Sequence, residues 1–289
     1  MRLRIVHQTR YFYHKPVQFG PHRLVLRPRE GHDLRVESMD VKIDPSAELT
    51  WSRDVFGNSI ATVEFEGLAT ELLIESSVII VRMSPVVRRK TPLAGITPWP
   101  PVYDPLERVA VKAYQQLSYP KDAAAVKAWL ENFRIKKPDY AEDVARNLNE
   151  YIYDELRYIR REEKGVLTPA QTLERGGGSC RDLATLLLES ARVLGIAARF
   201  ASGYLECQAA ELGEASTHAW TEIYHPGRGW EGYDPSTGEE TTARHVVTGV
   251  SNHPRGVMPV SGSYYGRAGA FKKMTIAVTV RPEMDLAPA

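Results

Sequence analysis

The spacing of apolar side chains changes once along the chain, and this change constrains the fold more than any other feature of the sequence. Up to about residue 83, apolar and polar residues alternate, as they do over residues 3–13, and this two-residue period is typical of strands that bury one face. Beyond a proline-dense stretch at residues 85–101, apolar residues recur every third or fourth position, which is the period of an amphipathic helix. We therefore expect an α+β protein, with an antiparallel β domain at residues 1–90 and a domain with most of the helices at residues 91–289.

Charge and composition limit the classes of partner. The 289 residues are 43% hydrophobic and 25% charged, as in an ordinary soluble globular protein. A formal net charge of +1 gives no field that would attract nucleic acid or an anionic membrane. The first residues interleave charged and apolar side chains, unlike a secretory signal, and the apolar stretches are too short to span a membrane. Two cysteines, Cys180 and Cys207, cannot form a disulfide framework, so we expect a cytoplasmic protein.

A glycine-rich segment that ends in a cysteine opens the best-defined predicted helix. Residues 176–182 read Gly-Gly-Gly-Ser-Cys-Arg-Asp and precede apolar residues at helical spacing, up to a capping glycine at Gly195. Ser179 and Asp182 have the spacing of a capping box, which puts Cys180 in the first turn. There the helix dipole favours the thiolate, which is only a few per cent of an ordinary cysteine with a pKa of about 8.5 at neutral pH. A cysteine in such a position is more often a small buried hydrophobe, so a nucleophilic role depends on its partners.

Two strand-like segments downstream could supply those partners. His218 lies in the sequence Thr-His-Ala-Trp, and Asp234 lies in Gly-Tyr-Asp-Pro-Ser. Two adjacent strands would present the imidazole and the carboxylate side by side, facing the helix start at Cys180. A Cys-His-Asp triad needs this layout, because the base must reach the sulfur while the acid holds its other nitrogen. Taken singly, the histidine would be a packed strand residue and the aspartate a turn former.

The remaining cysteine and histidines do not suggest a second site. Cys207 has no cap or glycine context and is interpreted as structural or incidental, and His225 and His245 receive no role. No Cys-x-x-Cys or His-x-x-x-His pair is present, so the spacing argues against a zinc site.

The three motifs, in this order, resemble the core of transglutaminase-like proteins. Tyr11-Phe12-Tyr13 and the Asp-Val-Phe-Gly-Asn sequence at residues 54–58 resemble the β domain at the N-terminus of bacterial members, so the likeness covers nearly the whole chain. The resemblance implies a papain-like, transglutaminase-like α+β catalytic domain after the β domain. It also implies that Cys180 is the nucleophile, His218 the base and Asp234 the acid that orients the base.

The resemblance also leads to expectations for Tyr158 and for residues 251–256. Tyr158 corresponds roughly to the place where relatives offer a side-chain donor to the oxyanion, beside the backbone N–H of Cys180. Ordinary packing at the end of a helix explains this tyrosine equally well. Residues 251–256, Ser-Asn-His-Pro-Arg-Gly, depart from the more acidic, tyrosine-containing segment expected near the edge of the site.

The implied activity is acyl transfer on a peptide or protein amide. The Cys180 thiolate would attack the carbonyl, His218 would protonate the departing amine, and water or a second amine would resolve the thioester. If water resolves the thioester, the protein is a peptidase or amidase; if an amine does, it is a transglutaminase. The resemblance to bacterial members favours hydrolysis. The alternatives are a catalytically silent peptide-binding module, which would normally have lost one of the three residues, and an arylamine acyltransferase, which would begin with helices. This chemistry requires neither a metal nor an organic cofactor, and the sequence makes no prediction of the oligomeric state.

Overall fold

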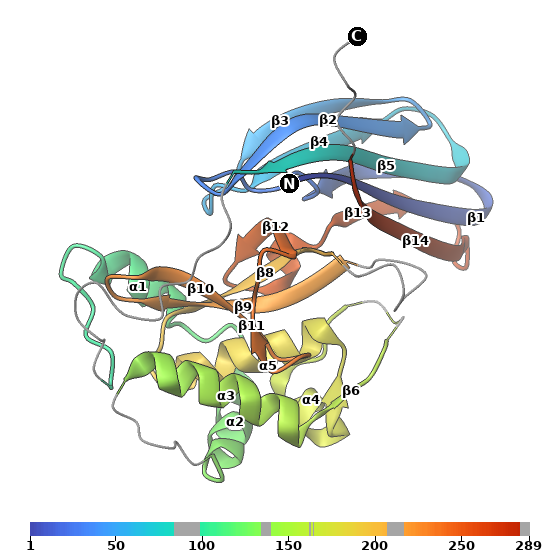
Figure 1. Ribbon diagram of the computed structural model, residues 1–289. Coiled ribbons are helices and arrows are strands. Elements are labelled where there is room, and N and C mark those ends of the chain that lie inside the picture. The colour runs from blue at the N-terminus through green and yellow to red at the C-terminus, as the bar shows by residue number, and fades with distance from the viewer. Residues whose placement is uncertain (84–98, 134–139, 162, 164, 207–216, 284–289) are drawn as a thin grey trace.

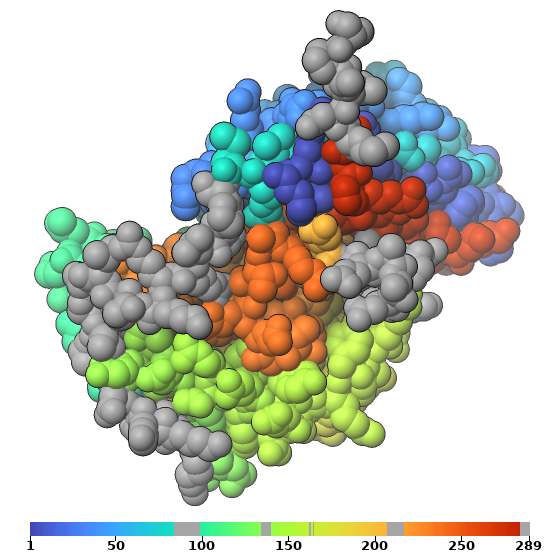
Figure 2. All heavy atoms as spheres, viewed as in Figure 1, coloured from blue at the N-terminus to red at the C-terminus, as the bar shows by residue number. Residues whose placement is uncertain are grey.

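The computed structural model describes residues 1–83, 99–133, 140–161, 163, 165–206 and 217–283. Figure 1 shows an upper β sheet in blue and red, a second sheet in yellow and orange beneath it, and a layer of green and yellow helices below. In the space-filling view of Figure 2 the orange segment fills the middle of this face, between the β strands above and the helices below. The predicted α+β class is confirmed.

The upper sheet has seven strands that all pair antiparallel. They are β1 (Arg2–Leu24), β2 (Leu34–Asp44), β3 (Ala47–Arg53), β4 (Ser59–Phe65), β5 (Ala69–Arg82), β13 (Val260–Tyr265) and β14 (Phe271–Pro282). The order is β2-β5-β1-β4-β3, and both β13 and β14 also pair with β1. The alternation at the N-terminus is that of a half-buried strand, because Leu3, Ile5 and Val17 are buried while their neighbours face outward.

The last two strands differ from the predicted division of the chain. Residues 91–289 were assigned to the second domain, but residues 260–282 return to the first sheet, where Leu3 pairs with Ile80 on one side and with Pro282 on the other. Without β14 the first half of β1 would lie at an edge with unpaired backbone groups. A pairing between the two ends of the chain leaves no local pattern in the sequence. Most of the predicted proline-rich connection lies outside the described residues.

The second part of the molecule combines helices with a five-stranded antiparallel sheet. Its helices are α1 (Arg108–Tyr114), η1 (Pro120–Asp122), α2 (Ala123–Leu130), α3 (Ala141–Glu155), α4 (Pro169–Arg175), α5 (Cys180–Val193) and η2 (Pro254–Val257). Its strands are β6 (Arg157–Tyr158), β7 (Gly177–Gly178), β8 (Ala198–Leu205), β9 (Thr217–His225), β10 (Gly229–Asp234), β11 (Glu239–Glu240) and β12 (His245–Ser251). The sheet order is β11-β10-β9-β8-β12, while β6 and β7 form a short parallel pair. Within the described residues, none of these helices is long and apolar enough to cross a membrane.

Helix α5 forms the centre of the core beneath the five-stranded sheet. Leu183, Leu186 and Leu187 are buried against α2, α3 and β9. The hydroxyl of Thr221 in β9 donates to the Ala184 carbonyl at 2.7 Å, which ties the sheet to the helix near its start. The first residue of α5 therefore has a fixed position relative to β9.

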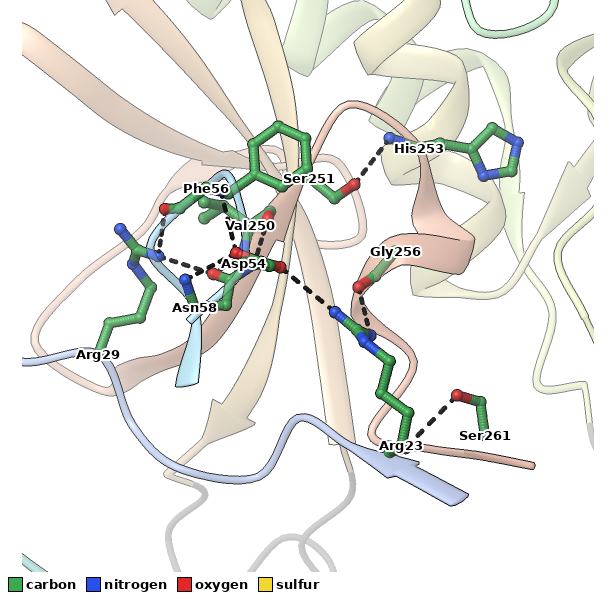
Figure 3. Close-up of polar contacts among 10 residues, drawn as sticks. All are labelled: Arg23, Arg29, Asp54, Phe56, Asn58, Val250, Ser251, His253, Gly256 and Ser261. Carbon is green, nitrogen blue, oxygen red and sulfur yellow. Dashed lines mark hydrogen bonds and ion pairs between the residues drawn. The ribbon is translucent and has the colours of Figure 1, made fainter. Parts of the chain in front are cut away.

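The upper sheet covers the outer edge of β12. Figure 3 shows the loop of residues 54–58, in which the buried side-chain amide of Asn58 accepts from the Val250 N–H at 2.9 Å and donates to the Val250 carbonyl at 2.8 Å. Arg23 joins the Asp54 carboxylate at 3.2 Å to the Gly256 carbonyl at 2.8 Å. The loop therefore acts as a hydrogen-bonding partner for an edge strand whose backbone groups would otherwise be unpaired.

Candidate active site

Cys180 is the first residue of α5, at the helix N-terminus that the sequence predicted, and is 8% exposed. Ser179 precedes it with extended backbone and donates both its backbone N–H and its hydroxyl to the Asp182 carboxylate, each at 2.8 Å. Asp182 thus caps the helix start, and Cys180 lies in the first turn, at the positive end of the helix dipole.

The buried Asp182 carboxylate also ties this helix start to the preceding loop. Its Oδ1 accepts from the Leu167 N–H at 2.7 Å, and the Arg161 guanidinium lies 3.4 Å from Oδ2, the oxygen that accepts from Ser179. A Cβ at Gly178 would lie 2.6 Å from the Asp182 Cβ, so the third glycine of the motif is required by the packing of this cap. The short segment before the helix therefore fixes Cys180 largely by itself.

The structure brings His218 and Asp234 together. His218 lies near the beginning of β9 and Asp234 ends β10, the strand paired with it. The His218 Nε2 is 2.6 Å from the Asp234 Oδ2, the distance of a charge-assisted hydrogen bond. The Asp234 side chain is fully buried and that of His218 is 10% exposed, so water competes little for this bond.

The charges around His218 explain its protonation. Burial by itself lowers the pKa of His218, but hydrogen bonds to Asp234 and Cys180 and the negative charges of both outweigh burial and raise that pKa to about 10. Because Nε2 faces Asp234, Nδ1 is the nitrogen that remains for Cys180. Burial would raise the pKa of Asp234, yet hydrogen bonds from His218, His245 and Ser236 hold it well below its ordinary value of 3.8. The site therefore favours a protonated His218 held against an ionised Asp234.

Asp234 is held at both oxygens. Its Oδ1 accepts from the Ser236 N–H at 3.0 Å and from the Ser236 hydroxyl at 2.6 Å, which makes the Asp-Pro-Ser sequence a closed turn. Its Oδ2 receives, besides His218, the Nε2 of His245 at 3.4 Å. A buried carboxylate needs such partners, because burying a charge without them costs several kcal/mol.

His245 received no role in the sequence analysis, yet it lies beside the two predicted residues. Its ring centroid is 5.9 Å from that of His218 and 5.2 Å from that of Trp220, which it meets edge to face. Trp220 in turn stacks on His218, with centroids 6.1 Å apart. Trp220 belongs to the Thr-His-Ala-Trp motif found in the sequence. No local pattern around residue 245, however, indicates that His245 contacts Asp234.

Tyr158 lies beside the short segment that precedes Cys180. It pairs with Gly178 in the parallel β6-β7 ladder, and a Cβ at Gly177 would lie 2.1 Å from the Arg157 carbonyl oxygen, so the glycine permits this approach. The residue is 55% exposed; partial burial, and then a negative charge at Cys180, raise the pKa of Tyr158. The hydroxyl is therefore within electrostatic reach of the sulfur, and its oxyanion role stays a prediction.

One group of side chains in the described part of the chain has the composition of a metal site. The potential ligand atoms of His218, Asp234 and His245 lie within 4.8 Å of one another. A separation of 2.6 Å between Nε2 and Oδ2 is, however, that of a direct hydrogen bond. We therefore treat the three as a hydrogen-bonded group. Cys207 lies outside the described residues, and His225 is buried at the other end of β9, with its Nε2 3.0 Å from the Tyr233 hydroxyl.

The segment at residues 251–256 is expected near the edge of the site, and its contacts are with the helical part and, at Gly256, with the upper sheet. The His253 ring stacks on Tyr119 with centroids 5.0 Å apart, and the Gly256 carbonyl accepts from Arg23.

Comparisons with known proteins agree with this architecture. Residues 3–81 match the bacterial transglutaminase-like N-terminal region, and residues 127–235 match the transglutaminase-like superfamily. The chain therefore carries a bacterial transglutaminase-like N-terminal region followed by a transglutaminase-like core, as the resemblance of its motifs predicted.

Similar proteins align over nearly the whole chain. An uncharacterized protein from Mycobacterium leprae is 27% identical over 96% of this chain and 98% of the relative, and one from Mycobacterium bovis is 29% identical over 91% and 88%. The crystal structure of a candidate cysteine protease from Cytophaga hutchinsonii aligns with a TM-score of 0.73 at 15% identity, covering 100% of this chain and 93% of that one. Family and fold together support a cysteine-based enzyme.

Proposed function

We propose that the protein is a cysteine peptidase or amidase that cleaves peptide or protein amides through a thioester on Cys180. The observation that carries the proposal is the 2.6 Å bond between His218 and Asp234, in a histidine whose pKa is raised to about 10 by hydrogen bonding to Asp234 and Cys180. An imidazolium at neutral pH, placed against the sulfur, is the partner that a thiolate nucleophile requires.

The two half-reactions transfer a proton through the same nitrogen, Nδ1 of His218. The Cys180 sulfur attacks the amide carbonyl, the C–N bond breaks, and His218 gives its Nδ1 proton to the departing amine, which leaves a thioester and a neutral imidazole. A water then attacks the thioester while His218 takes its proton at Nδ1, the C–S bond breaks, and the thiolate and imidazolium are restored. Asp234 holds Nε2 in both steps, so the ring keeps its orientation.

The oxyanion of each tetrahedral intermediate would meet the free N–H groups at the start of α5. The backbone N–H of Cys180 supplies one donor and the Tyr158 hydroxyl the second. Tyr158 lies in β6, which pairs with β7 directly before the helix start, so this pairing brings both donors to the N-terminal end of α5.

Hydrolysis is proposed over amine transfer because the solved structure that aligns over the whole chain is a candidate cysteine protease. Amine transfer by the same three residues is the second candidate, since both reactions share the thioester. A silent peptide-binding module is the third, and it predicts no activated cysteine.

The test measures the alkylation rate of Cys180 against pH, by mass spectrometry of the labelled peptide, in the wild-type protein and in His218→Ala. Cys207 in the same molecule is the internal control. We expect Cys180 to react well below pH 7, to outpace Cys207, and to lose this advantage in His218→Ala. Equal titration of both thiols near pH 8.5, unchanged by the substitution, would refute an activated nucleophile and favour the binding module.

Turnover separates the two enzymatic candidates. A peptide library is incubated with the protein, with and without an added primary amine, and products are identified by mass. Cleaved or deamidated peptides formed equally in both samples support hydrolysis, whereas products that carry the amine show transamidation. Cys180→Ala is the control that must abolish either product.

A further inference from the structure

We propose that His245 is a positioning residue for Asp234, and that the N-terminal β domain holds it there through β12. The β domain would thereby contribute to the active site without touching substrate. This inference rests on the proposed function, because it concerns how the Asp234-His218 pair is kept in place. It assigns a role to a histidine and to a domain that the mechanism above does not use.

The hydrogen bonds of His245 fix its tautomer. The Thr242 backbone N–H donates to Nδ1 at 3.0 Å, so Nδ1 is an acceptor and the neutral ring carries its proton on Nε2. Nε2 faces the Asp234 Oδ2 at 3.4 Å, and the Trp220 ring contacts the imidazole edge to face. The ring is therefore held at both nitrogens and delivers an N–H to the carboxylate.

The oxygen that His245 contacts is the one that His218 uses. Asp234 Oδ2 lies between the Nε2 atoms of the two histidines, at 2.6 Å from His218 and 3.4 Å from His245, while Ser236 occupies Oδ1. With donors at both oxygens the buried carboxylate cannot rotate away from His218. Removing the second imidazole would leave Oδ2 with one donor and open space beside it.

His245 belongs to a strand that is not adjacent to β10, the strand of Asp234. β12 lies at the far side of the sheet from β10, with β8 and β9 between them, so the contact with Asp234 reaches across the end of the sheet. His245 is the first residue of β12, where it pairs with Leu205 of β8. Its position thus depends on where β12 begins and how that strand is held.

The upper sheet holds β12 along its whole outer edge. Arg82 of β5 donates to the His245 carbonyl at 2.9 Å, the Arg29 N–H donates to the Val247 carbonyl at 2.8 Å, and Asn58 makes two bonds to Val250. Figure 3 shows the last of these contacts. The side chain of Val246 packs in one cluster with residues of β1, β2 and β5. The bond from Arg82 falls on His245 itself, so the β domain acts on the residue that contacts Asp234.

The experiment compares two amide side chains at position 245. Gln places its N–H₂ near the position of the imidazole Nε2, whereas the shorter Asn does not reach it. The readout is the pH profile of Cys180 alkylation, with the unfolding temperature measured alongside. We expect His245→Gln to stay within about threefold of wild type at pH 6, and His245→Asn to lose about tenfold, the effect of one hydrogen bond to a charged group. The profile of His245→Asn should also shift toward that of His218→Ala.

The role of the domain is tested with Arg82→Met, alone and combined with His245→Asn. Arg82→Met should lower the alkylation rate in the same direction, and should add little in the double variant, because both changes act through one contact. Effects that multiply, or an Arg82→Met protein with the wild-type profile, would overturn the coupling to the β domain. If His245→Asn does not fold, His245→Phe keeps the ring volume without its N–H and is expected to show the same loss.

The two proposals fail in different ways. If Cys180 is not activated in the wild type, the proposed function is wrong and this inference falls with it. If Cys180 is activated in the wild type and equally in His245→Asn and His245→Gln, only the positioning role is wrong.

Discussion

At the start of α5 the groups that fix Cys180 belong to the helix cap and the loop before it, whereas those that fix Asp234 come from different strands of the five-stranded sheet. Ser179, Asp182 and Leu167 lie within 15 residues of one another and bond among themselves. Asp234 is held by His218 from β9, by Ser236 from the following turn, and by His245 from β12. The cysteine half of the site should therefore tolerate changes elsewhere, while the histidine-aspartate half depends on the packing of the whole molecule.

Gly203 offers the strongest test of this difference. It pairs with His218 in β9 and with Val247 in β12, and a Cβ there would lie 1.9 Å from the Val246 carbonyl oxygen and 3.1 Å from the Trp220 ring. Gly203→Ala should lower the free energy of unfolding by about 3 kcal/mol, because backbone of two strands must move apart. Urea denaturation measures the change. Gly31→Ala, whose added Cβ meets only a surface carboxylate, is the matched control, and equal effects of the two would contradict the packing argument.

Asp234→Asn removes the charge from the histidine side while leaving the helix start intact. We expect the alkylation rate of Cys180 at pH 6 to fall about a hundredfold, since a buried hydrogen bond to a charged group is worth about 2 to 3 kcal/mol. The hydrogen bonds of Asp182 to Ser179 and Leu167 do not involve this residue, so the circular dichroism of the helices should not change. A wild-type rate in this variant would show that Asp234 does not act on the Cys180-His218 pair.

The pH dependence of stability tests the histidine-aspartate half of the site without a mutation in α5, the helix that carries Cys180. Because the pKa of His218 is raised from 6.5 to about 10, its protonation stabilises the fold fully below pH 6.5, and this contribution is lost as the pH rises toward 10. The pKa of Asp234 is lowered, so the ionised carboxylate stabilises the fold above pH 3.8, and this contribution is lost as the pH falls further. Wild type should exceed His218→Gln in stability by an amount on the order of 2 kcal/mol at pH 5 to 6 and by less at pH 10. Unfolding free energies of the two proteins across this range check the sign, and a difference that grows toward pH 10 would contradict it.

Tyr158→Phe is expected to have the smallest effect. The side chain is more than half exposed, so stability should change by less than about 0.5 kcal/mol. If the hydroxyl donates to the oxyanion, turnover of a peptide substrate should fall about fivefold with little change in KM, because the bond forms only in the transition state. A wild-type turnover number would leave the Cys180 backbone N–H as the donor from this half of the site.

Several elements were predictable because their signal is local. The alternation over residues 3–13 follows from one buried face of β1, and the Ser-Cys-Arg-Asp start followed by spaced leucines predicts α5 and the place of Cys180 in it. The motifs around His218 and Asp234 were found by resemblance, and the two residues do lie on paired strands. These features depend on residues close together in the sequence or on a recognisable pattern of motifs.

Other elements left no such signal. The pairing of β14 with β1 joins the two ends of the chain, and no local pattern indicates it. Local sequence gives no signal for the contact of His245, because a histidine at the start of a strand has many ordinary explanations and Asp234 lies on a strand that does not pair with β12.

The sequence by itself determined the fold class, the helix that carries Cys180 and the three residues proposed for catalysis, because periodicity, capping and motif order are written in neighbouring residues. The tertiary structure decided that the two ends of the chain share one sheet, that the N-terminal domain covers the edge of β12, and that His245 meets Asp234. These contacts form because edge strands and buried carboxylates require partners, and packing of the whole chain selects which residues supply them.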